Sequence, residues 1–131
     1  MNKLTFGIGN AKLGKEIATF SLPSGFTCPG ALNCLSKANK ETGKITDGAE
    51  TTFRCFSASQ EATFPNVRRS RWENFDTLKT FGADFSAMAD FISANLPKQK
   101  IVRIHVAGDF YSQAYFDAWL EVAKRNSEKT F

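Results

Sequence analysis

The stretch Lys100–Val106, together with the Gly108–Asp109 pair after it, constrains the fold more than any other part of the chain. Its residues are β-branched and apolar at both odd and even positions, which is typical of a strand buried on both faces. The glycine and the aspartate end this strand, and an amphipathic helix is predicted from about Ser112. A strand, a tight turn and a helix form the unit from which parallel sheets are built, so we predict an α/β fold.

Two helices are predicted before this β–α unit. Pro65 stands where the first begins, a position that proline favours, and Gly82 ends it. The second is expected over Ser86–Leu96, where Pro97 stops it. Residues 65–131 are therefore predicted as helix, helix, strand and helix.

The residues before Pro65 carry weaker signals. The β-prone runs Leu4–Phe6 and Ile17–Leu22 are separated by glycine-rich sequence, which favours an N-terminal β-hairpin. The segment 51–63 alternates like a strand in its first half and is compatible with a helix in its second. We expect residues 1–64 to form this hairpin and irregular cysteine-bearing loops. Together with residues 65–131 they should make one domain with a partial parallel or mixed sheet.

Charge and hydropathy limit the classes of protein and of partner. The chain has 131 residues, with 17 Lys and Arg against 13 Asp and Glu, and this mild positive charge permits contact with nucleic acid without requiring it. No apolar run approaches the ~20 residues of a membrane span. The N-terminus lacks the apolar core of a secretory signal, so we expect a cytoplasmic protein.

Three cysteines and one histidine are the soft metal donors of the chain. Cys28 and Cys34 flank a short loop, Cys55 follows later, and His105 lies in the predicted strand. Thiolate and imidazole donors suit Zn²⁺ or an iron–sulfur cluster, and in a reducing compartment a disulfide framework is not expected. The spacing matches no common zinc module, so buried or merely reduced thiols remain the alternative.

The end of the predicted strand is a second candidate site. Ligands of open α/β sheets bind at the carboxyl ends of the strands, where His105 and Asp109 are expected to lie with Tyr111 and Ser112. This position makes His105 and Asp109 candidates for acid–base catalysis. The alternatives are a hydrogen-bonded core histidine and, for Asp109, the favoured role of capping the following helix.

A basic run with a tryptophan is the third candidate site. It consists of Arg68, Arg69, Arg71 and Trp72 on the first predicted helix, and guanidinium groups beside an indole suit contact with phosphates and bases. The alternative is a solvated helix face on which Arg71 packs along its stem.

Four segments carry a resemblance to a known family: Phe6–Gly14, Leu22–Gly30, Arg54–Phe56 and His105–Gln113. They occur in order over nearly the whole chain and resemble the gene product 88 family of phage proteins. The resemblance implies that family members continue with another strand, so this chain is expected to lack their C-terminal part.

Three interpretations of function remain open. In the first, the chain is a truncated enzyme that acts on or near nucleic acid and holds a metal or iron–sulfur centre at its cysteines. In the second, it is a binding module without catalysis. Such a module would grip nucleic acid or inhibit a host defence complex such as a CRISPR effector. In the third interpretation an open sheet edge leads to a homodimer.

Overall fold

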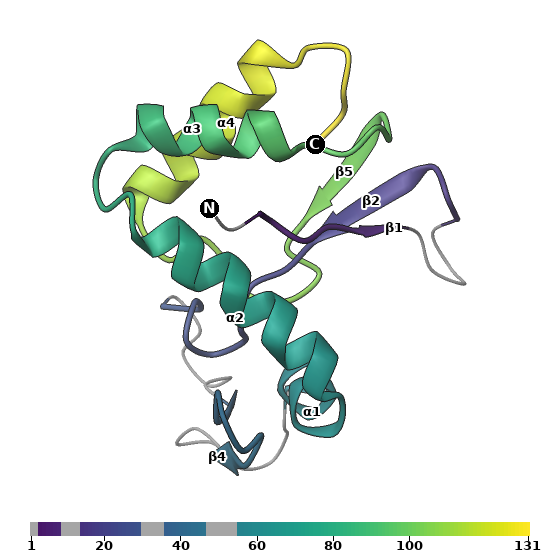
Figure 1. The fold of residues 1–131 in the computed structure, drawn as a ribbon, viewed down its shortest axis with the longest axis vertical. Coiled ribbons are helices and arrows are strands. Elements are labelled where there is room, and N and C mark those ends of the chain that lie inside the picture. The colour runs from purple at the N-terminus through teal and green to yellow at the C-terminus, as the bar shows by residue number, and fades with distance from the viewer. Residues whose placement is uncertain (1–2, 9–13, 30–35, 47–54) are drawn as a thin grey trace.

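The computed structural model describes residues 3–8, 14–29, 36–46 and 55–131, and these form a mixed α/β fold (Figure 1). This confirms the predicted fold class. The elements in chain order are β1 (Gly7–Ile8), β2 (Ile17–Phe20), β3 (Lys37–Ala38), β4 (Ile45–Thr46), α1 (Phe56–Thr63), α2 (Pro65–Lys79), α3 (Phe85–Asn95), β5 (Ile101–Ile104) and α4 (Gln113–Arg125).

The larger sheet has the strand order β1-β2-β5. β1 and β2 are antiparallel, with Gly7 opposite Thr19, which confirms an N-terminal hairpin, although its first strand begins just after the predicted run Leu4–Phe6. β2 and β5 are parallel, in a register that places Ile17 beside Ile101. The sheet is therefore mixed, and β5 with α4 forms the predicted β–α unit. After α4 the chain returns to the edge of β5, where Thr130 makes an isolated parallel bridge to Ile101.

The helices form where proline and apolar spacing predict them. α2 has Pro65 in its first turn, and α3 ends two residues before Pro97. The sequence of residues 51–63 was compatible with both strand and helix, and the structure forms the helix α1 from Phe56 onward. Figure 1 shows α3 and α4 packed together beside the sheet, while α2 leads away to α1 and the small β3–β4 pair. None of the described helices is both long and apolar enough to cross a membrane.

The core lies between the sheet and the helices. In α4 the buried residues fall on one stripe at helical spacing, Tyr115, Ala118, Trp119 and Val122. They pack with apolar side chains of β2, α2 and α3, among them Phe20, Leu78, Met88 and Ile92.

The predicted burial of β5 on both faces is wrong. Val102 is fully buried, but Ile101 is 42% exposed and Arg103 is also exposed. β5 therefore alternates like a strand with one covered face, as strands of mixed or antiparallel sheets do. The apolar residue Ile101 on its outward side suggested that both faces of β5 are covered, but no described element covers that side.

Candidate functional site

The carboxyl ends of β2 and β5 are joined by hydrogen bonds that continue beyond the strands. The backbone N–H groups of His105 and Val106 donate to the carbonyl of Phe20, at 2.9 and 3.2 Å. The N–H of Leu22 donates in turn to the carbonyl of Ala107, at 3.0 Å. The segment that leads to Cys28 and the turn that follows β5 therefore lie side by side, where ligands of parallel sheets bind.

Gly108 allows a close approach between these two segments. Its φ is +81°, and a Cβ there would lie 2.6 Å from Oγ1 of Thr27 and 2.9 Å from the carbonyl oxygen of Leu22. The Thr27 hydroxyl also bonds both segments, because it donates to the carbonyl of Pro23 at 2.8 Å and accepts from the N–H of Asp109 at 3.3 Å. A glycine is thus required at position 108 for steric and conformational reasons.

The structure brings two of the three predicted cysteines together. Cys28 and Cys55 are both free and half-buried. Burial raises the pKa of the Cys28 thiol above its usual value. Hydrogen bonds from Gly25 and Thr27 partly offset this rise, and the negative charges of Asp109 and of a Cys55 thiolate add to it. Cys55 and Asp109 therefore each lie within electrostatic range of Cys28, and we call these three residues the thiol site.

The donor set of the thiol site is incomplete within the described residues. Cys34, the third predicted ligand, lies outside them. In the part of the chain that the structure describes, no three His, Cys, Asp or Glu side chains are grouped closely enough to hold a metal ion. Two sulfur donors and one nearby carboxylate are what these residues offer.

His105 occupies a strained and specifically bonded position next to this site. Its φ is +64°, in the left-handed region that costs a non-glycine residue about 1–2 kcal/mol. Its Nε2 lies 2.8 Å from the hydroxyl of Tyr115, and its ring meets that of Phe110 edge-on at 4.6 Å. Burial lowers the pKa of His105 to about 4, although the charge of Asp109 works in the opposite direction. The imidazole is therefore neutral at physiological pH.

Tyr111 extends the aromatic surroundings of His105. Its ring stacks on that of Tyr115 with centroids 4.7 Å apart and meets Phe75 edge-on at 5.0 Å. Burial raises the pKa of Tyr111 to about 12, and within the described structure its buried hydroxyl has no hydrogen-bond partner. Tyr111 thus adds a buried hydroxyl without a partner among the described residues to the aromatic cluster around Tyr115.

Asp109 does not cap α4, so the favoured interpretation of this residue is wrong. The cap is Ser112, whose side chain accepts a hydrogen bond from the N–H of Tyr115. The Asp109 carboxylate instead accepts from the N–H of Phe110 at 2.7 Å and remains exposed. Asp109 is therefore accessible for another role.

The predicted basic run is mostly internal. Arg68 and Arg71 are only 8% and 7% exposed. Arg68 donates to the carbonyls of Glu61 at 2.7 Å and Lys40 at 3.2 Å, and Arg71 donates to the Glu61 carboxylate at 2.8 Å. These guanidinium groups are held by partners inside the protein, which differs from both the nucleic-acid and the solvated-face interpretations.

The other two members of the run differ from each other. Trp72 is buried, and the Nζ atoms of Lys40 and Lys79 lie 5.1 and 5.8 Å from its ring centroid. Arg69 is exposed, with only a long contact of 3.5 Å to Oδ1 of Asn66. Arg69 is thus the member of the run most available to a ligand.

Glu61 is a buried, paired residue next to the candidate site that the sequence did not reveal. It is fully buried in α1, and its Oε2 accepts from Arg71 and from the N–H of Ser24 at 3.1 Å. Because Ser24 precedes Cys28 in the same loop, Glu61 ties this loop to both α1 and α2. A lone glutamate in a short polar segment gave no pattern that identified this partner.

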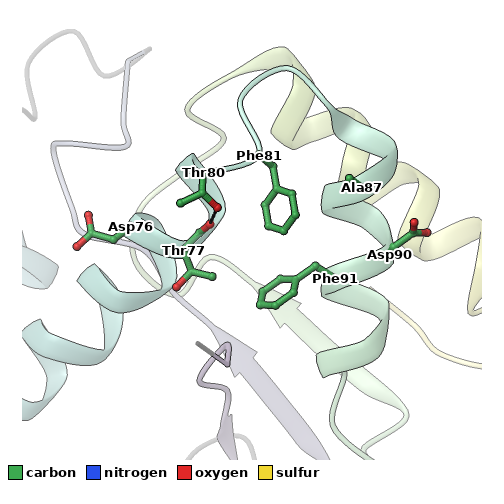
Figure 2. A pocket seen from close by; sticks show the side chains of 7 residues that line it. All are labelled: Asp76, Thr77, Thr80, Phe81, Ala87, Asp90 and Phe91. Carbon is green, nitrogen blue, oxygen red and sulfur yellow. Dashed lines mark hydrogen bonds between the residues drawn. The ribbon is translucent and has the colours of Figure 1, made fainter. Parts of the chain in front are cut away.

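A wide groove lies between α2 and α3 (Figure 2). Its volume is about 590 Å³, and the rings of Phe81 and Phe91 line it with Ala87, while Asp76 and Asp90 mark opposite ends of its rim. Both carboxylates are already paired, Asp76 with two lysines and Asp90 with Arg125. None of the candidate site residues lines this groove.

The comparisons with known proteins identify a family. A model of the family described as gene product 88 matches residues 2–131. The chain belongs to the gene product 88 family, a phage-type group. This match gives no support to the expectation that a C-terminal part is missing. Neither a curated protein nor a solved structure shows significant similarity to the chain.

Proposed function

We propose that this member of the gene product 88 family binds a metal ion or an iron–sulfur cluster through Cys28 and Cys55, with Cys34 as the third sulfur donor. One observation carries the proposal. Two free, half-buried thiols from distant parts of the sequence lie within electrostatic range of each other, at the carboxyl ends of parallel strands.

The chemistry of the thiol site supports a soft cation. Thiolates are the preferred donors for Zn²⁺ and for iron–sulfur clusters. In the free protein, burial and the Asp109 carboxylate raise the pKa of Cys28 and disfavour its thiolate. A bound cation would reverse this effect, because it stabilises the ionised sulfur. The described residues provide two sulfur donors, so the proposal requires Cys34 to contribute.

His105 stays outside the proposed donor set. Its Nε2 is occupied by the Tyr115 hydroxyl, so His105 and Asp109 are better suited to bind or orient a second ligand next to the metal. A bound zinc ion would supply Lewis acidity there, and a cluster would supply electron transfer. In an enzymatic role, Asp109 would accept or donate a proton, and His105 would keep its neutral imidazole.

Elemental analysis of protein purified without oxygen tests this proposal. We expect zinc or iron in stoichiometric amount, and we expect Cys28→Ser, Cys34→Ser and Cys55→Ser each to lose most of it. His105→Asn is the matched control, since it should keep the metal. A folded wild-type protein with no bound metal and three freely titrating thiols would contradict the proposal.

A second candidate function is a binding module for nucleic acid. It is supported by Phe26, which is 38% exposed and has Nζ of Lys37 5.0 Å from its ring centroid. Phe26 also contacts Trp72, one helical turn from the exposed Arg69. Exposed rings beside cations suit single-stranded nucleic acid. We rank it second because Glu41, Glu73 and Asp76 line the neighbouring groove of about 400 Å³ and oppose a polyanion.

Arg69→Ala combined with Lys37→Ala tests the second candidate. This change should weaken salt-dependent binding of a single-stranded oligonucleotide and reduce the salt slope. Arg103→Ala, which removes an exposed charge from β5, is the control. Arg68 and Arg71 are unsuitable probes of this surface because both are buried and bonded inside the protein. Equal affinities of all variants would exclude this surface, and capture of a host complex such as a CRISPR effector would then be the next candidate.

A further inference from the structure

Glu61 is buried in a place where burial of a carboxylate is costly. α1 has eight residues, of which only Ala58 and Glu61 are buried, and Glu61 is completely inaccessible to solvent. Removing a carboxylate from water costs several kcal/mol unless good partners compensate for the loss. A short helix with so little apolar surface gains little from burying such a group, so the contacts of Glu61 indicate what it does.

These contacts join three segments. Oε2 of Glu61 accepts from the N–H of Ser24 in the loop after β2 and from Nη1 of Arg71 on α2. Arg71 holds α1 at two further points, the carbonyl of Ser57 at 3.3 Å and Oε1 of Gln60 at 3.1 Å. The ion pair therefore fixes α1 along most of its length and fixes the loop to it.

Both cysteines lie close in sequence to these attachment points. Cys55 directly precedes α1, two residues before Ser57, and Cys28 is four residues after Ser24. The intervening loop is short and internally bonded, since the N–H of Cys28 donates to the carbonyl of Gly25 at 3.3 Å. One hydrogen-bonded connection between the segments that carry the two cysteines thus passes through the Glu61 carboxylate.

We infer that the Glu61–Arg71 pair positions Cys28 relative to Cys55, and so sets the separation of the two thiols for a ligand that bridges them. Glu61 and Arg71 are positioning residues, because they act on the ligand through the cysteines. The inference rests on the proposed function only in taking the two thiols as the binding groups. It applies to any soft ligand that binds both sulfur atoms at once and needs no particular metal.

Phenylarsine oxide is a probe of this separation. One molecule condenses with two thiols, forming two arsenic–sulfur bonds and releasing one water, with no change in oxidation state. In a Cys34→Ser background only Cys28 and Cys55 remain, so stable one-to-one binding requires both sulfurs to reach the same arsenic atom. The affinity is measured by competition with a small dithiol, and the adduct is identified by intact mass.

We expect Glu61→Ala to weaken arsenical binding at least about tenfold, and Glu61→Gln to weaken it less, because the amide oxygen can still accept from Ser24. Arg68→Ala is the matched control. Arg68 is equally buried on α2, but among the described residues its side chain bonds the β3–β4 segment and the carbonyl of Glu61 and not residues 24–28. The affinity of the Arg68→Ala variant for the arsenical should stay within about twofold of that of the Cys34→Ser background. Circular dichroism at the assay temperature verifies that each variant is folded, and Glu61→Gln serves as the probe if Glu61→Ala does not fold.

The outcomes separate the two proposals. Equal affinity of the Glu61 variants and the background would overturn the positioning role and leave metal binding intact. A metal-free wild-type protein whose Glu61 variants still lose arsenical affinity would overturn metal binding and support positioning. Absence of any arsenical adduct in the background would overturn both, since the thiols would then be too far apart.

Discussion

Two polar clusters lie next to each other in this protein, and they differ in how many of their groups are already bonded. In the first, Glu61, Arg68 and Arg71 are buried and bond to carbonyls, a carboxylate and a backbone N–H. In the second, the thiols of Cys28 and Cys55 are free and only half-buried, beside the exposed carboxylate of Asp109. The arginines use their hydrogen-bonding capacity within the fold, whereas the cysteines of the thiol site are in no disulfide and remain partly exposed.

The difference shows that residue type alone is a poor guide to function. Three arginines beside a tryptophan suggested a surface for phosphate, yet two of them hold secondary-structure elements together. Two cysteines without a known spacing suggested much less, yet they converge. What distinguishes a structural from a functional cluster is whether its polar atoms already have partners, because an unpaired group near the surface can bind a ligand.

The largest expected effect comes from breaking the first cluster. Arg71→Ala should destabilise the protein by about 3–5 kcal/mol, because it leaves the Glu61 carboxylate buried without its cation. Urea denaturation measures this change. Arg69→Ala, on the exposed side of the same helix, should change the free energy of unfolding by less than about 0.5 kcal/mol. Equal effects of the two substitutions would mean that the buried pair is not structural.

An intermediate effect is expected from His105, which borders the thiol site. Its pKa is about 4 in the folded protein and 6.5 in the unfolded chain, so the unfolded state binds the proton more tightly. The contribution of about 3 kcal/mol is therefore complete above pH 6.5 and is lost as the pH falls towards 4. The free energy of unfolding of His105→Asn, measured from pH 7 to 4, should vary less than that of the wild type. Parallel curves for the two proteins would show that His105 is not buried in its neutral form.

The smallest effect on stability is expected from the thiol site itself. Cys28→Ser and Cys55→Ser remove half-buried sulfurs that make few bonds, so the metal-free protein should lose less than about 1 kcal/mol. Thermal unfolding in the presence of a chelator checks this. A loss comparable to that of Arg71→Ala would assign the cysteines to the core instead of to a ligand site.

Local sequence patterns predicted much of the fold and less of the site. Pro65 marks the start of α2, Pro97 the end of α3, and Gly108 with Asp109 the end of β5. These signals are readable from the sequence because the backbone restrictions of such residues act within a few positions. The partner of Arg71 was not predictable, since Glu61 lies on another helix and their meeting depends on how α1 and α2 pack. The cap at Ser112 was missed because Asp109 is an equally good cap in sequence and only the length of the turn decides between them.

X-ray absorption at the metal edge tests the central claim most directly, because it counts the atoms around a bound ion. For metal-loaded wild-type protein we expect three sulfur neighbours, at about 2.3 Å if the metal is zinc. One sulfur should disappear in each single cysteine variant that still retains metal, and none in His105→Asn. A shell of nitrogen and oxygen neighbours only, at about 2.0–2.2 Å, would show that a bound metal ion lies elsewhere and would contradict the thiol site.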